Sequence, residues 1–159
     1  MSILANHEAL SSSFIPEKLV HREKEQAQLL YNLKNSINTF MHGSIGSGKT
    51  ALIKNTINKF NGPGNKAVYI DCSLYQTTNS ILREILSKMS VIIFSRSNYD
   101  LTKKLEEKTR NSKPVICLDH FEHLKDGELV GKLIGIGLCV IIISDSEENY
   151  ALLDPKTRS

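Results

Sequence analysis

The sequence predicts an α/β protein in which helices cover both faces of a parallel β-sheet. Segments with the patterns of strands and helices alternate along the chain, which is the order expected of such a sheet. Residues 115–118 and 138–143 are continuous apolar runs, as in strands buried on both sides. A glycine-rich segment, residues 43–50, lies between a predicted strand and a predicted helix. The 159 residues suffice for one domain with a core of its own.

The elements follow in a regular order after a polar, serine-rich start. We expect residues 1–13 to be flexible and residues 14–159 to form the domain. Apolar runs predict four core strands, at residues 37–42, 67–72, 114–119 and 138–144. Apolar residues at helical spacing predict helices at about residues 21–36, 51–60, 78–89, 98–110 and 128–134. Residues 91–94 fit either a strand or a continuation of the helix before them.

Composition sets limits on the function. The net charge of +3 permits contact with nucleic acid without indicating it. The three cysteines, Cys72, Cys117 and Cys139, lie far apart in apolar runs and are expected to be buried thiols. The first 13 residues lack the pattern of a signal peptide, and the longest apolar run is too short to cross a bilayer. We therefore expect a cytoplasmic protein without membrane contact.

Residues 43–50 match the phosphate-binding loop pattern GxxxxGK followed by Ser or Thr. Its glycines let backbone N–H groups converge on an anion, and the start of the next helix adds partial positive charge. A glycine-rich turn without this role is the alternative, and the flanking strand and helix argue against it. ATP or ADP with Mg²⁺ is thus the expected ligand, Lys49 reaching the β- and γ-phosphates and Thr50 the metal. The candidate nucleotide-binding residues are Gly43, Ser44, Ile45, Gly46, Ser47, Gly48, Lys49 and Thr50.

ATPases with this loop require a second motif, a carboxylate at the end of a buried strand, which lies on the magnesium side. Asp119 ends the strand 114–119 and is the candidate magnesium-side residue together with Thr50. A glutamate that activates water usually follows that aspartate, but here His120 occupies the position. A neutral imidazole can accept a proton with a different reach and charge, so we expect slow or absent hydrolysis. Glu122 follows two residues later, near a turn or helix start.

Two other interpretations of nearby residues are weaker. His120 and His123 could share a metal ion, but no further ligand is close in sequence, and a solvated turn is the simpler interpretation. Tyr69, Tyr75 and Phe94 could stack on bases, but no basic stripe accompanies them, so we expect them to pack in the core.

Several segments together resemble one family. The opening stretch contains Pro16-Glu17 and His21-Arg22-Glu23, and the other similar segments are 43–50, 69–77, 118–124 and 153–159. In these the chain resembles archaeal replication-initiator ATPases, the AAA+ proteins related to eukaryotic origin-recognition and cell-division-cycle loading factors. The resemblance covers residues 14–159 and implies a P-loop NTPase fold of three layers, α, β and α.

The resemblance also assigns roles to single residues. Leu19, Val20 and Arg22 would border the adenine or ribose. The family's sensor residue, usually Asn, falls on Asp145, which cannot donate a hydrogen bond to the γ-phosphate while it is ionised. His120 is the first departure from the family's catalytic pattern, and Asp145 is the second.

The chain stops just before the arginine finger of the family. The fifth strand, the helical lid and the winged-helix domain of the family are expected to be missing, which would leave strand 37–42 at an open edge. A fragment, a decayed paralogue and a protein that completes its sheet with a partner remain open alternatives.

The function predicted from the sequence is the ATP-binding core of a replication initiator, acting as a nucleotide switch in an AAA+ homo- or hetero-oligomer. DNA would be reached only through missing domains or partners. The alternative is a non-hydrolysing module that binds nucleotide and regulates a full-length AAA+ partner. A small-molecule kinase is disfavoured, because the late chain offers only Arg158 near the phosphates.

Overall fold

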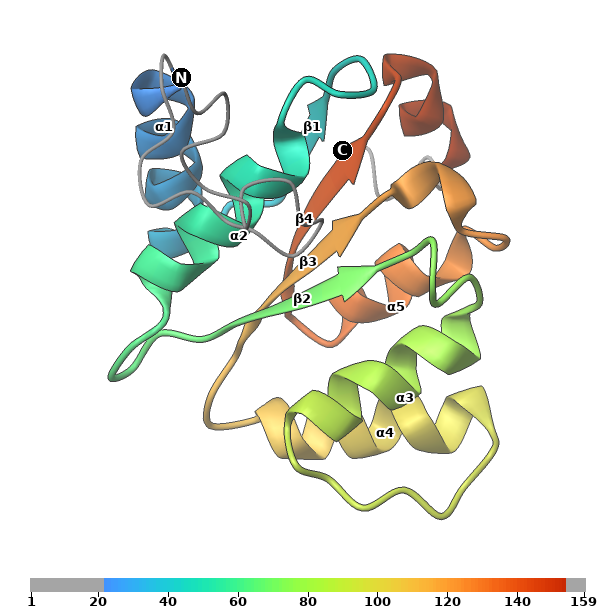
Figure 1. Cartoon of the computed structure of the whole chain (residues 1–159). Coiled ribbons are helices and arrows are strands. Elements are labelled where there is room, and N and C mark those ends of the chain that lie inside the picture. Colours follow the sequence, from blue (N-terminus) through green and yellow to red (C-terminus); the bar gives the residue numbers. More distant parts are fainter. Residues whose placement is uncertain (1–21, 154–159) are drawn as a thin grey trace, which may run out of the picture.

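The computed structural model describes residues 22–153. The predicted flexible segment and the candidate adenine contacts Leu19 and Val20 therefore lie outside the described residues. The chain alternates between helices and strands as predicted (Figure 1). The elements are α1 (Glu23–Lys34), β1 (Thr39–His42), α2 (Lys49–Phe60), β2 (Ala67–Asp71), α3 (Thr78–Lys88), α4 (Asn98–Thr109), β3 (Val115–Asp119), the 3-10 helix η2 (Phe121–His123), α5 (Glu128–Gly135), β4 (Cys139–Ser144) and the 3-10 helix η3 (Glu147–Leu152).

The four strands form one parallel sheet, as the sequence predicts, and their order is β1-β4-β3-β2. All four strands point the same way, so their carboxyl ends meet at one edge (Figure 1). That edge carries His42, Asp71, Asp119 and Ser144 at the ends of the four strands. Functional side chains that follow the strands are thereby gathered on one side of the molecule.

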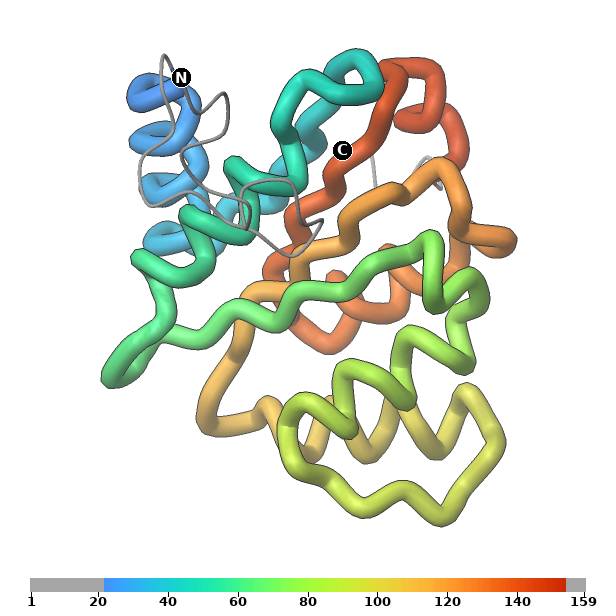
Figure 2. Tube along the Cα trace, viewed as in Figure 1, coloured from blue at the N-terminus to red at the C-terminus, as the bar shows by residue number. Residues whose placement is uncertain are grey.

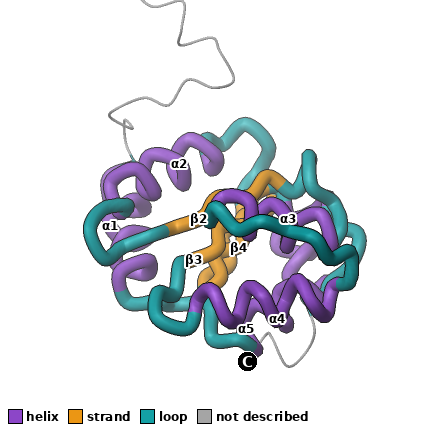
Figure 3. The backbone as a smooth tube through the Cα atoms, turned by 90° about the horizontal axis from the view of Figure 1, so that it is seen from below, coloured by secondary structure: helices purple, strands orange, loops and turns teal. Residues whose placement is uncertain are grey.

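Helices cover both faces of the sheet, which gives the predicted three layers. Leu29 and Leu33 of α1 and the apolar face of α2 pack on one face, against Cys117 and Ile141. Helices α3, α4 and α5 pack on the other face, with Leu118 among the strand residues there. Seen from below, the strands lie between the two groups of helices (Figure 3). Alternate residues of β3 thus enter opposite cores, which explains its continuous apolar sequence.

The three cysteines are buried in these cores, as expected. Burial, with a smaller contribution from nearby acidic groups, raises the pKa of Cys72 to about 12. Burial also raises the pKa of Cys139 to about 11. The thiols therefore stay protonated at neutral pH and act as small apolar side chains.

Residues 91–94 correct the sequence analysis, because they form neither a strand nor a continuation of α3. Ser90 adopts a left-handed backbone conformation with φ 58°, which ends the helix. The following loop joins α3 to α4 (Figure 2). Ile92 and Phe94 are exposed, whereas Val91 and Ile93 pack partly on the core. The expectation that Phe94 lies in the core is wrong, since the side chain is 88% exposed.

Strand β1 is at one edge of the sheet and, within residues 22–153, pairs with β4 alone. None of the helices in the described part of the chain is long and apolar enough to span a bilayer.

Candidate functional site

The glycine-rich segment forms a tight turn between the end of β1 and the start of α2. Gly46 and Gly48 have φ values of 79° and 83°, in the left-handed region that favours glycine. Gly48 is the N-cap of α2, so the loop leads directly into the helix N-terminus. At Gly43 a Cβ atom would lie 3.2 Å from the Ser47 Oγ, so a side chain there would crowd the turn. The sequence therefore folds here into a concave backbone of the kind that binds anions.

Lys49 is the first residue of α2, and its side chain folds back over the loop. Its Nζ donates to the carbonyl oxygens of Gly43 and Ser44, the latter at 2.9 Å, and lies 3.4 Å from the Ser47 Oγ. The ammonium group is thus held within the turn, next to the N-terminus of α2. A phosphate group bound in the turn would meet this positive charge directly.

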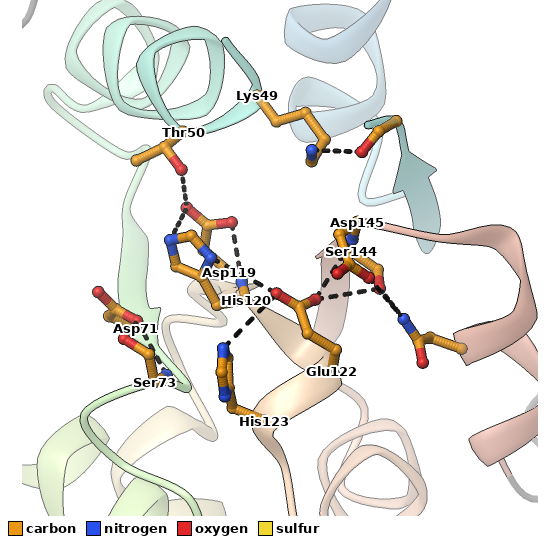
Figure 4. A network of polar contacts seen from close by, with 12 residues as sticks. Lys49, Thr50, Asp71, Ser73, Asp119, His120, Glu122, His123, Ser144 and Asp145 are labelled. Atoms are coloured by element: carbon orange, nitrogen blue, oxygen red, sulfur yellow. Dashed lines mark hydrogen bonds and ion pairs between the residues drawn. The ribbon is translucent and has the colours of Figure 1, made fainter. Parts of the chain in front are cut away.

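The side chains of Asp119 and Thr50 are in direct contact at the cavity, although the two residues lie on different elements. The Thr50 Oγ1 donates to the Asp119 Oδ2 at 2.7 Å (Figure 4). The Tyr69 hydroxyl donates to the same oxygen at 2.8 Å, and the backbone N–H of His120 donates to the Oδ1 at 2.9 Å. Asp119 is 1% exposed, and these three donors satisfy its carboxylate. Burial and the neighbouring negative charges raise the pKa of Tyr69 far above its usual range, so the phenol remains a donor.

His120 directly follows β3 and adopts a left-handed conformation with φ 54°. Its Nδ1 lies 3.6 Å from the Glu122 Oε1, and its Nε2 lies 3.9 Å from the Asp119 Oδ2. The His123 Nε2 lies 3.9 Å from the same Glu122 oxygen (Figure 4). The imidazole of His120 therefore sits between two carboxylates at the mouth of the site.

Asp145 lies directly after β4, and its surroundings differ from those of a free sensor side chain. The Glu122 Oε2 accepts from the Ser144 Oγ at 3.2 Å and from the Asp145 backbone N–H at 3.3 Å. The Asn149 Nδ2 in η3 donates to the Ser144 Oγ at 2.7 Å and to the Asp145 Oδ1 at 3.0 Å. Glu122 thus connects the end of β3 to the end of β4, and Asn149 supplies an amide beside Asp145.

These groups surround one cavity of about 640 Å³. One wall comes from the loop and α2, and the other comes from the residues that follow β3 and β4. The loop wall consists of Ile45, Gly46, Gly48, Lys49, Thr50, Ala51 and Lys54. The strand wall consists of Asp119, His120, Glu122, His123, Ser144 and Asp145.

The remaining candidate residues lie close to the cavity without lining it. Gly43, Ser44 and Ser47 shape the loop, in which the Ser47 N–H donates to the Ser44 carbonyl at 3.1 Å. Arg22 donates to the Ser47 carbonyl and pairs with Glu25 through its Nε at 2.9 Å. The structure therefore brings Arg22 to the phosphate loop, and its proposed contact with adenine or ribose stays a prediction.

Five residues that line the cavity are not among the candidate site residues predicted from the sequence, namely Ala51, Lys54, Glu122, His123 and Ser144. Tyr69 and Asn149, which bond Asp119 and Asp145, are not among them either. Lys54 lies one turn beyond Thr50 on α2, and this helical spacing would have placed it beside the loop. Tyr69 reaches Asp119 because β2 and β3 pair with Asp71 opposite Asp119. That register brings the phenol near the carboxylate, and it cannot be derived from either strand alone.

The donor set fits a nucleotide with Mg²⁺. Hydroxyl and carboxylate oxygens of Thr50 and Asp119 are hard ligands, and magnesium is usually held by one or two such groups together with phosphate oxygens. Lys49 and the turn supply positive charge and backbone donors for the phosphates. Within residues 22–153, the cavity included, no group of three or more His, Cys, Asp or Glu side chains is arranged to hold a metal ion.

Comparison with known proteins identifies the family. Residues 34–145 match the AAA domain family, and the chain belongs to it. The chain is 31% identical to the ORC1-type DNA replication protein of Picrophilus torridus, over 99% of this chain and 44% of that protein. It is 26% identical to the ORC1-type DNA replication protein 1 of Archaeoglobus fulgidus, over 99% of this chain and 45% of that protein. The resemblance to archaeal replication initiators that the sequence motifs indicate is thereby confirmed.

The fold agrees with a solved structure of related type. The crystal structure of Cdc6p from Pyrobaculum aerophilum superimposes with a TM-score of 0.84 at 23% identity, over 99% of this chain and 47% of that one. This likeness confirms the predicted αβα fold of a P-loop NTPase. The chain spans less than half the length of these relatives.

Proposed function

We propose that this chain is the ATP-binding part of an AAA+ replication initiator and acts as a nucleotide switch with weak or absent hydrolysis. One observation carries the proposal. The phosphate loop, with Gly46 and Gly48 in left-handed conformations, opens into the same cavity as the bonded pair Thr50 and Asp119. The residues proposed for anion binding and for magnesium binding thus line one pocket, and Thr50 and Asp119 join its two walls.

Each residue has a distinct part in nucleotide binding. The loop amides and the Lys49 ammonium bind the phosphate oxygens. To do so, Lys49 gives up its hydrogen bonds to the Gly43 and Ser44 carbonyl oxygens. Thr50 and Asp119 hold the magnesium side. Magnesium, when bound, neutralises charge on the phosphates. Arg22 restrains the loop through the Ser47 carbonyl, and its contact with the adenine or ribose is part of the proposal.

Slow hydrolysis follows from the strand wall of the cavity. His120 stands where a water-activating carboxylate is expected, and it is engaged with Glu122 at 3.6 Å. Asp145 brings negative charge to the sensor position, where a neutral donor would stabilise the γ-phosphate. Bound ATP would therefore persist because its hydrolysis is slow, and a neighbouring AAA+ subunit would respond to its presence.

The names of the relatives support a role for the proposed switch in DNA replication. The chain would meet DNA through other parts of a longer protein or through partners, and a cytoplasmic location belongs to the same proposal.

Calorimetric titration with ATP and magnesium tests the binding. We expect wild-type protein to bind ATP and Lys49→Ala to bind it about 10- to 100-fold more weakly, because a charge-assisted contact is lost. Lys59→Ala is the matched control, since Lys59 lies at the far end of α2 and bonds Gln26. Equal affinity in wild-type protein and Lys49→Ala would refute the proposal.

Turnover measured on the same protein tests the switch. Hydrolysis at about 1 per second or more, lost in Lys49→Ala, would identify an ordinary ATPase instead.

A second candidate function is a non-hydrolysing module that regulates a full-length AAA+ partner. The observation in its favour is that both His120 and Asp145 line the cavity, so both catalytic departures lie at the reaction centre. Co-purification of a longer AAA+ protein with this chain, combined with nucleotide binding and no turnover, would favour this function.

A further inference from the structure

The Asp119 carboxylate is held from three directions. The Oδ1 accepts from the main chain at His120, while the Oδ2 accepts from Thr50 at 2.7 Å and from the Tyr69 phenol at 2.8 Å. Thr50 and Asp119 are implicated by the sequence motifs, whereas Tyr69 belongs to neither motif. Tyr69 comes from β2, which pairs with β3 on the side away from β4.

The Tyr69 phenol bonds Asp119, at the end of β3, and not Asp71, at the end of its own strand β2. Asp71, two residues after Tyr69, is occupied in its own turn, because its Oδ1 accepts from the Ser73 backbone N–H at 2.9 Å and from the Ser73 hydroxyl at 2.6 Å. The Lys54 ammonium lies over the Tyr69 ring, 5.0 Å from its centroid, and restrains the ring by a cation–π contact. The Tyr69 ring is thus fixed by one wall of the cavity and its hydroxyl by the other.

A carboxylate that holds a metal needs a fixed orientation, and its outer hydrogen-bond partners supply it. Without Tyr69, the Oδ2 would keep one side-chain donor, Thr50, which itself belongs to the magnesium side. When magnesium and nucleotide bind, the Thr50 hydroxyl would turn to the metal, whereas the Tyr69 phenol would keep its hydrogen bond to Asp119. It therefore fixes the carboxylate before the ligand arrives.

We propose that Tyr69 is a positioning residue for magnesium, which orients Asp119 so that the cation strengthens nucleotide binding. This inference rests on the proposed function, because it concerns the metal side of the same pocket. Tyr69 itself touches neither phosphate nor metal in this scheme. Its removal should affect binding only through Asp119.

The experiment compares ATP affinity in excess EDTA with affinity in excess magnesium, by calorimetry on the full chain. The ratio of the two dissociation constants is the magnesium effect. In Tyr69→Phe we expect unchanged affinity in EDTA and a magnesium effect that is about 10-fold smaller, as for other partners of metal ligands. Tyr75→Phe is the matched control, because Tyr75 lies beside Glu84 in a different pocket, and it should keep the full magnesium effect.

Asp119→Asn shows whether Tyr69 acts through Asp119. In that background the additional Tyr69→Phe change should reduce the magnesium effect no further, since the two residues form one unit. Thermal unfolding is recorded for each variant. Tyr69→Leu is a second variant without the phenol, and it should show the same split if Tyr69→Phe does not fold.

Three results would overturn the inference. An undiminished magnesium effect in Tyr69→Phe would show that the phenol does not position Asp119. An equal loss of affinity with and without magnesium would show a merely structural role. If wild-type protein binds no ATP at all, the proposed function fails and this inference fails with it, whereas ATP binding with an intact magnesium effect in Tyr69→Phe refutes only the inference.

Discussion

The two walls of the cavity differ in how closely they follow the pattern of an ATPase. The loop wall has every residue that phosphate binding requires, in a backbone conformation that suits the task. The strand wall includes Asp119, His120 and Asp145. The resemblance to the family leads us to expect a water-activating carboxylate at the position of His120 and a neutral sensor at that of Asp145. In the proposed function, phosphate binding depends on the loop wall and turnover depends on the strand wall, so the chain can retain the first while the second weakens.

Charge separates the walls as well. Lys49 and Lys54 belong to the loop wall, whereas Asp119, Glu122 and Asp145 belong to the strand wall. A triphosphate would lie between positive charges on one side and negative charges on the other. Opposite charges favour its binding and like charges oppose the approach of its terminal phosphate to the strand wall. This charge asymmetry predicts a site that binds nucleotide but does not accelerate its hydrolysis.

The largest expected effect concerns the strand wall. His120→Glu restores a carboxylate directly after Asp119 and should raise the turnover number about 100-fold, near the lower end of what a positioned base contributes. The measurement is phosphate release under saturating ATP and magnesium. The backbone at His120 has φ 54°, so the glutamate variant should also fold with slightly reduced stability.

His123→Glu is the control for that change. His123 lines the same wall and lies 3.9 Å from Glu122, so the variant adds the same charge at a position that does not follow Asp119. It should not increase turnover. If His120→Glu leaves phosphate release unchanged or lower, His120 does not occupy the water-activating position and the contrast between the walls has another cause.

A smaller effect is expected from the loop wall. Gly48→Ala places a Cβ atom on a residue with φ 83°, 3.2 Å from the Arg22 Nη1. The free energy of unfolding should fall by about 1 to 2 kcal/mol, the usual cost of a left-handed conformation. ATP affinity in calorimetry should fall about 10-fold, because the turn that aims the amides is strained.

Gly62→Ala provides the comparison for Gly48→Ala. A Cβ atom at Gly62 would meet nothing within 4 Å, and Gly62 lies in the turn after α2. The affinity for ATP should stay unchanged in this variant. Equal losses in the two variants would mean that the left-handed turn at Gly48 is not what binds the phosphates.

The loop wall could be predicted from the sequence because all its parts are local. A strand, a glycine turn and the first turn of a helix occupy consecutive residues, and each leaves a pattern of its own. The parallel sheet was equally accessible, since buried strands such as β3 and β4 are continuous apolar runs. The helix bounds differ from expectation by a few residues at most, because terminal turns carry weak signals.

The strand wall was predictable only in part because it depends on contacts between distant segments. Glu122 reaches Ser144 and Asp145 through η2, and Asn149 reaches them through η3, and neither short helix has a clear sequence pattern. Tyr69 depends on strand register. The prediction for residues 91–94 was wrong for a related reason. Their apolar composition suggested a buried strand or helix, but the side chains of Ile92 and Phe94 are exposed.

The smallest expected effect tests the charge of the strand wall alone. Asp145→Asn removes one negative charge and should tighten ATP binding about threefold in the presence of magnesium, because like-charge repulsion with the terminal phosphate is relieved. The asparagine oxygen can still accept from Asn149, so the local structure should persist. Glu147→Gln, the same change of charge on an exposed neighbour in η3, should leave affinity unaltered. Unchanged or weaker binding in Asp145→Asn would show that the Asp145 carboxylate does not face the bound phosphates, and the division of the cavity into a binding wall and a repelling wall would have to be abandoned.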